Sequence, residues 1–164
     1  AEVHARLGLI YFQEGKFDAA IPALREAIKL KPGLPKVDAL LAMSLSEIGH
    51  YDEALPGVTK AFSQSSDSVL RRMAGLHLQR IYTGLGRDQD AVDVALKLFR
   101  HNVERYSDYA NGWDSLADGL EADGQLAEAL RAQEKAVKLG EAQRDPLVGQ
   151  FRAHLERLKK GGKR

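Results

Sequence analysis

Apolar residues recur along this chain at spacings of three and four, in segments separated by glycine or proline. The pattern is clear near the C-terminal end, where the recurring residues are Leu147, Val148, Phe151, Leu155 and Leu158. Such spacing places side chains on one face of an α-helix. Applied to the whole chain, the pattern predicts helices at 2–14, 18–30, 35–48, 52–64, 68–84, 88–105, 110–123 and 127–139. A further helix should follow Asp145-Pro146, which resembles an N-cap followed by a first helical residue. The predicted fold class is all-α.

The helices come in pairs that repeat along the chain. Residues 1–34 align with residues 35–68 without a gap and share eight identities. The identical pairs are Val3 with Val37, Ala5 with Ala39, Leu7 with Leu41, Gly15 with Gly49, Asp18 with Asp52, Ala20 with Ala54, Pro22 with Pro56, and Ala27 with Ala61. Further units begin near residues 72 and 110. A fixed period of this length is typical of stacked helical repeats.

The period and the order of residue types resemble the tetratricopeptide repeat, whose pattern is W-x2-L-G-x2-Y…A-x3-F…P. The matching residues of the first unit are Leu7, Gly8, Tyr11, Ala20, Leu24, Ala27 and Pro32, with His4 in place of the tryptophan. The fourth unit has Trp113, Leu116, Ala117, Leu120, Gly124, Ala129 and Ala136. The resemblance implies a right-handed solenoid of antiparallel helix pairs over residues 1–140. A capping helix at 141–160 and a disordered basic tail at 161–164 would follow.

The repeat makes two kinds of local prediction. Glycines at the end of each first helix should adopt the left-handed conformation that ends helices; they are Gly15, Gly49, Gly86 and Gly124. Small residues at Gly8, Ala20 and Ala27 should let paired helices approach closely. Pro22 and Pro56 fall inside the second helices, where proline removes a hydrogen bond, so we expect a late helix start or a slight bend there.

Composition narrows the functional classes. The net charge is +1, which argues against a dedicated nucleic-acid binder. No cysteine is present, and no apolar run reaches the roughly 18 residues that a membrane span needs. The chain as given shows no signal peptide, and its localisation stays unknown. No nucleophile–base set, metal-ligand spacing or phosphate loop is recognisable, so we predict no enzyme activity, no metal and no cofactor.

The resemblance places a binding groove along the first helix of each unit. The residues expected to line it are Leu9, Phe12, Met43, Met73, Leu76, His77, Arg80, Asp114, Asp118 and Glu121. This surface would change from apolar to acidic along the chain, and exposed apolar patches usually mark binding. The apolar members could instead contact neighbouring helices. For the acidic members three interpretations stay open: a solvated face, recognition of a basic partner, or a cation or catalytic site.

These features favour a protein-interaction module that binds a peptide or protein segment with apolar anchors and a basic end. The carboxylate clamp of chaperone-binding relatives is not matched, because its positions hold Ala5, Leu9, Leu40, Met73 and His77. The alternative is a structural or homo-oligomerisation domain of a larger protein. A homodimer could then form through the first helix, where Leu9 and Ile10 are candidates for contact.

Overall fold

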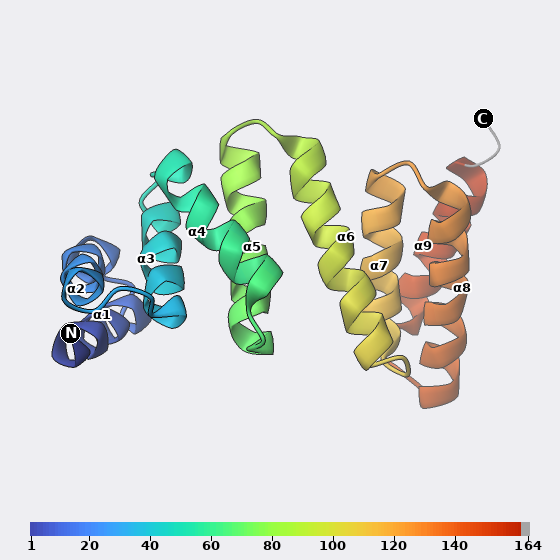
Figure 1. The fold of residues 1–164 in the computed structure, drawn as a ribbon. Helices are drawn as coiled ribbons and strands as arrows, with labels where there is room; N and C mark the ends of the chain where they lie inside the picture. Colours follow the sequence, from blue (N-terminus) through green and yellow to red (C-terminus); the bar gives the residue numbers. More distant parts are fainter. Residues whose placement is uncertain (162–164) are drawn as a thin grey trace. The chain divides into compact units, whose positions relative to one another are not determined.

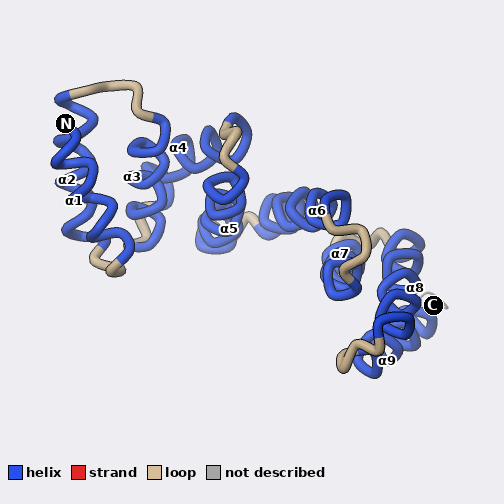
Figure 2. Tube along the Cα trace, turned by 90° about the horizontal axis from the view of Figure 1, so that it is seen from below, coloured by secondary structure: helices blue, strands red, loops and turns tan. Residues whose placement is uncertain are grey.

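The computed structural model describes residues 1–161, and the last predicted tail residues, 162–164, lie outside this range. The described chain forms helices joined by short loops and contains no strand (Figure 2). The helices are α1 (Glu2–Gln13), α2 (Phe17–Leu30), α3 (Pro35–Glu47), α4 (Tyr51–Gln64), α5 (Ser68–Gly84), α6 (Asp88–Arg105), α7 (Ala110–Ala122), α8 (Leu126–Gln143) and α9 (Val148–Gly161). The all-α fold class is therefore confirmed.

The chain divides into two compact units. Unit 1 comprises Ala1–Ala91, which includes α1 to α5, and unit 2 comprises Val92–Arg164. Within unit 1, consecutive helices pack against each other, and α3 also contacts both α1 and α5 (Figure 1). Within unit 2, α8 packs against both α7 and α9. Each unit therefore has its own core.

Small residues bring paired helices together, as the repeat predicts. In unit 1, Gly8 of α1 lies so close to Leu24 of α2 that an added Cβ would be 2.5 Å from the Leu24 Cγ. The side chains of Ala20, Leu24 and Ala27 are wholly buried. Gly57 of α4 meets α3 in the same way, with the added Cβ 2.6 Å from that of Ala42. These crossings explain why the repeat uses glycine and alanine there.

The core of unit 2 is built from α6, α7, α8 and α9. Its buried apolar residues are Leu96, Val103, Leu116, Ala117, Leu120, Ala129, Ala132 and Leu158. Gly119 of α7 admits the ring of Phe99 from α6, which would lie 3.1 Å from an added Cβ. A second cluster joins Phe151 of α9 to Ala110 and Ala136. The C-terminal helix is thus part of this core.

The turn glycines behave as expected, whereas one of the two alternatives for the prolines is wrong. Gly15, Gly49, Gly86 and Gly124 all have φ between 68° and 82°. The expected late helix start at Pro22 and Pro56 is wrong, because α2 and α4 begin five residues before them. A proline one turn into a helix sacrifices a single hydrogen bond, and burial of the apolar face of each helix outweighs that loss.

The eighth helix is longer than expected. We expected it to span 127–139, but α8 ends at Gln143 and is followed by Arg144, which has a left-handed φ of 54°. Gly140 is buried inside α8, where an added Cβ would lie 3.1 Å from the Phe151 ring. Its role is therefore close packing with α9. The helix after Asp145-Pro146 begins at Val148, and Asp145 accepts a hydrogen bond from the Leu147 amide.

Candidate functional site

The apolar residues predicted for the groove lie partly on one surface of unit 1. Phe12 of α1 contacts His77 of α5, with ring centroids 6.5 Å apart, so these faces of α1 and α5 adjoin. Leu9 lies one turn before Phe12 and is 39% exposed, and Leu76 beside His77 is 58% exposed. We call the set Leu9, Phe12, Met73, Leu76, His77 and Arg80 the α1–α5 surface.

The two methionines predicted for the groove differ in accessibility. Met43 of α3 is wholly buried, so the expectation that it lines a groove does not hold. The reason is that α3 is contacted by α1 on one side and by α5 on the other. Met73 of α5 is half-buried and keeps some accessible surface.

A polar group closes the edge of this surface. Arg80 forms an ion pair with Glu47 at the end of α3, and His77 Nδ1 lies 3.5 Å from the same carboxylate. His77 Nδ1 is also 2.6 Å from the Ser46 hydroxyl. Burial lowers the pKa of His77, with Arg80 adding to this and Glu47 opposing it, which favours the neutral ring. The charges of Arg80 and Glu47 compensate each other.

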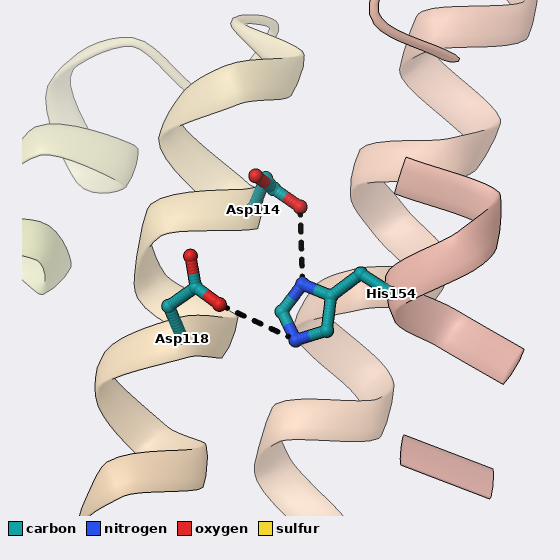
Figure 3. Close-up of side chains that lie close together, drawn as sticks. All are labelled: Asp114, Asp118 and His154. Atoms are coloured by element: carbon teal, nitrogen blue, oxygen red, sulfur yellow. Dashed lines mark hydrogen bonds and ion pairs between the residues drawn. The ribbon is translucent and has the colours of Figure 1, made fainter. Parts of the chain in front are cut away.

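The acidic residues predicted for the groove lie in unit 2 and face their own chain. His154 of α9 lies between them, with only 9% of its side chain exposed (Figure 3). Its Nδ1 is 3.2 Å from Asp114 Oδ1, and its Nε2 is 3.4 Å from Asp118 Oδ1 and 3.2 Å from Glu121 Oε2. Burial raises the pKa of Asp118, and His154 opposes that shift. We call Asp114, Asp118, Glu121 and His154 the α7–α9 cluster.

Two further side chains hold this cluster. Arg157, one turn after His154, lies 2.7 Å from Glu121 Oε2 and 3.8 Å from Asp118. Gln133 of α8 is wholly buried and donates from Nε2 to Asp114 Oδ1 at 2.6 Å and to the Phe151 carbonyl at 2.9 Å. The Gln133 Oε1 atom has no hydrogen-bond partner among the described residues.

The same device therefore occurs once in each unit. In each, a histidine and an arginine one turn later contact the carboxylate of a glutamate at the end of an earlier helix. His77 and Arg80 contact Glu47, and His154 and Arg157 contact Glu121. We call these the first and second His–Arg clasps. Neither clasp was predicted from the sequence. The recurrence of His-Leu-x-Arg at 77–80 and 154–157 is the signal that could have revealed them.

Unit 2 also has a shallow hollow beside α7 and α8. It measures about 200 Å³ and is lined by Trp113, Leu116, Leu120, Glu128, Arg131 and Ala132. The hollow brings together no nucleophile, base or set of metal ligands. It therefore offers a contact surface and no recognisable chemistry.

Comparison with known proteins identifies the family of the first helix pair. Residues 1–34 match the model of the tetratricopeptide repeat, which is the segment containing α1 and α2. Residues 1–34 are therefore a tetratricopeptide repeat. Repeats of this family generally serve as non-catalytic scaffolds for protein interactions. No helix in the described part of the chain is long and apolar enough to cross a membrane.

One curated relative and several solved structures are similar to this chain. The TPR repeat-containing protein YpiA of Bacillus subtilis (strain 168) is 26% identical over 137 residues, which are 82% of this chain. The match spans 30% of the length of that relative. MamA 41-end from Desulfovibrio magneticus RS-1 has a TM-score of 0.58 at 16% identity, covering 97% of this chain and 93% of that one. Another MamA crystal structure has a TM-score of 0.56 at 19% identity, covering 99% and 87%. These structures show the helical-solenoid fold class of the repeats and nothing of their partners.

Proposed function

We propose that this chain binds a polypeptide segment on the α1–α5 surface. The observation that carries the proposal is the exposure of Leu9 and Leu76 on helices whose faces adjoin through Phe12 and His77. Large apolar residues left exposed together usually mark an interface. Buried apolar anchors also supply most of the energy in known interfaces.

The charges around this surface favour an apolar ligand. Arg80 is paired with Glu47, and Arg6 of α1 is paired with Glu2 at 2.8 Å. Recognition would therefore rest on apolar side chains, and Met73 could adapt to their shape because methionine is flexible. A helix with apolar residues on one face, or an extended segment with two apolar anchors, fits this surface.

The proposal leaves out the basic ligand end that the sequence suggested. Asp114, Asp118 and Glu121 already face His154 and Arg157 of α9. A basic ligand would have to displace these side chains before it could pair with the carboxylates. The ligand chemistry proposed here is thus limited to apolar anchors on unit 1.

The test begins with selection of peptides from a random library displayed on phage, using the purified chain as bait. Selected peptides are then measured by fluorescence anisotropy against Leu76→Lys and against Leu30→Lys as the matched control. Leu30 at the end of α2 is 54% exposed, close to the 58% of Leu76, so neither change disturbs the core. We expect Leu76→Lys to weaken binding by roughly 1–3 kcal/mol, the size typical of a lost anchor, and Leu30→Lys to leave it unchanged. Equal affinity for both variants would refute the proposed surface.

A second candidate function, self-association, is favoured by a different face of α1. Val3, Leu7 and Ile10 are exposed there. Their counterparts one repeat later include Val37 and Ser44, which are buried. This stripe would suit a helix of a second copy of the chain. Sedimentation of the wild type and of Ile10→Lys over a concentration series tests this: a dimer that the substitution abolishes supports self-association, and a monomer throughout excludes it.

A further inference from the structure

The two His–Arg clasps differ in their balance of charge. The first clasp has one carboxylate, that of Glu47, which contacts Arg80 and His77. Burial lowers the pKa of His77, which favours its neutral form. In the second clasp, Asp114, Asp118 and Glu121 surround His154, and Arg157 is the only other cation that contacts them among the described residues. The second clasp therefore has two more carboxylates than the first with the same number of basic groups.

The spacing of the α7–α9 cluster suits a metal ion. Nitrogen and oxygen ligands lie about 2.0–2.2 Å from a tetrahedral Zn²⁺, which places them about 3.3–3.6 Å from one another. His154 Nε2 is 3.4 Å from Asp118 Oδ1 and 3.2 Å from Glu121 Oε2. The imidazole nitrogen thus already lies at such a distance from each of the two carboxylate oxygens, and Asp114, Asp118 and His154 each offer one ligand atom within 4.8 Å of the others. Figure 3 shows Asp118 and Asp114 approaching His154 at different ring nitrogens.

The other nitrogen of His154 has the partner expected of a metal-binding histidine. A ligating histidine usually donates its second ring N–H to a carboxylate or carbonyl, which fixes the orientation of the ring. Asp114 Oδ1 lies 3.2 Å from His154 Nδ1 and can accept that hydrogen bond. Asp114 is held in turn by Gln133 Nε2 at 2.6 Å. The chain Gln133–Asp114–His154 would therefore aim Nε2 at the space next to Asp118 and Glu121.

Gln133 provides an observation independent of the carboxylates. Its side chain is wholly buried and is directed at Asp114, yet its Oε1 has no partner among the residues described. Burial of an unpaired amide oxygen is unfavourable, and an apolar residue of similar size would avoid it. The amide is explained if the fixed position of Asp114 matters for something beyond packing.

We propose that the α7–α9 cluster binds a divalent transition-metal ion of the Zn²⁺ type. His154 Nε2, Asp118 and Glu121 are the protein ligands, water completes the coordination, and Asp114 and Gln133 orient the imidazole. One imidazole with two carboxylates suits zinc or a similar ion better than calcium or magnesium, which prefer oxygen ligands alone. Arg157 competes with the ion for Glu121, and its side chain is 62% exposed, so it can swing into solvent when the ion binds. The bound ion would fasten α9 to α7.

The experiment uses the tag-free full chain, stripped of metal and titrated with CoCl2 and with ZnCl2 near neutral pH. We expect one Co²⁺ per chain with the visible absorption of a low-symmetry four- or five-coordinate site, and displacement of Co²⁺ by Zn²⁺. Asp118→Asn removes a ligand at a side chain that is 60% exposed, so folding should persist while affinity falls about tenfold or more. His154→Gln should abolish the absorption.

Two further variants separate a metal site from an ion-pair network. His50→Gln removes an exposed histidine outside the cluster and should leave metal binding unchanged. Arg157→Gln removes the competing cation, so it should lower the dissociation constant for Co²⁺ severalfold, although it weakens the ion pairs that hold α9. Absence of stoichiometric binding would overturn the proposal. Binding that Asp118→Asn does not weaken, or that His50→Gln abolishes, would overturn it equally.

Discussion

Replacing Gly8 with alanine should destabilise the protein, although helix propensity alone predicts the opposite. Gly8 lies in the middle of α1, where alanine is favoured over glycine by about 1 kcal/mol. Against this gain, the new Cβ would be placed 2.5 Å from both Cγ and Cδ2 of Leu24. Leu24 is wholly buried and cannot move away freely. Overpacking of this kind costs about 1–3 kcal/mol, so the net effect is a loss of up to about 2 kcal/mol.

The same substitution should become stabilising once Leu24 is removed. Leu24→Ala leaves a cavity and should cost about 2–5 kcal/mol. In that background the Cγ and Cδ2 atoms that the Cβ at position 8 would meet are gone, and Gly8→Ala recovers its helix-propensity gain of about 1 kcal/mol. The predicted coupling between the two substitutions is therefore about 1–3 kcal/mol. Gly149→Ala is the matched control, because this glycine lies in α9 with nothing within 4 Å of an added Cβ, and it should stabilise in both backgrounds.

Urea unfolding followed by circular dichroism supplies the free energies of unfolding of the wild type and of the five variants. Because the chain has two compact units, amide hydrogen exchange in α1 and α2 should accompany it, to assign each change to unit 1. If Gly8→Ala stabilises the wild-type chain as much as Gly149→Ala does, then α1 and α2 do not pack as closely at Gly8 as described, and the predicted overpacking is refuted.

Two further predictions concern pH. Asp67 caps α5 by accepting hydrogen bonds from the Leu70 and Val69 amides, and these bonds together with Lys36 hold the pKa of Asp67 below its usual range. The cap therefore stabilises the fold fully above the usual pKa of aspartate, and this stabilisation is lost as the pH falls through the lowered pKa of the folded state. Asp67→Ala should therefore lower the melting temperature at neutral pH, and the difference should shrink below roughly pH 4; a pH-independent difference would argue against the cap. Burial lowers the pKa of His77, so the neutral imidazole is the form that the folded state favours. The contribution of His77 to stability is therefore fully present above about pH 6.5 and is lost as the pH falls further. Between roughly pH 7 and 5, the melting temperature of His77→Gln should thus fall less than that of the wild type. An equal fall in both proteins would contradict this.

The sequence predicts the helices well because their signals are local. Apolar spacing, and turn glycines such as Gly15 and Gly49, each act within a few residues. The sequence predictions are wrong where segments distant in the sequence meet. Met43 was expected to be accessible because of its position in the repeat, but α1 and α5 both contact its helix. None of the three interpretations of the acidic residues on α7 paired them with their own chain, because His154 lies 40 positions after Asp114 on a helix outside the repeat period.

The most direct test of the proposed function is methyl NMR of the chain titrated with a selected peptide. Unit 1 supplies methyl probes on both sides of the α1–α5 surface, namely Leu9 on α1 and Met73 and Leu76 on α5. The proposal predicts that these signals shift together and saturate at one peptide per chain, while those of Leu30 and Leu126, exposed on other helices, stay in place. Shifts confined to Val3, Leu7 and Ile10, or to the methyl groups of unit 2, would contradict it.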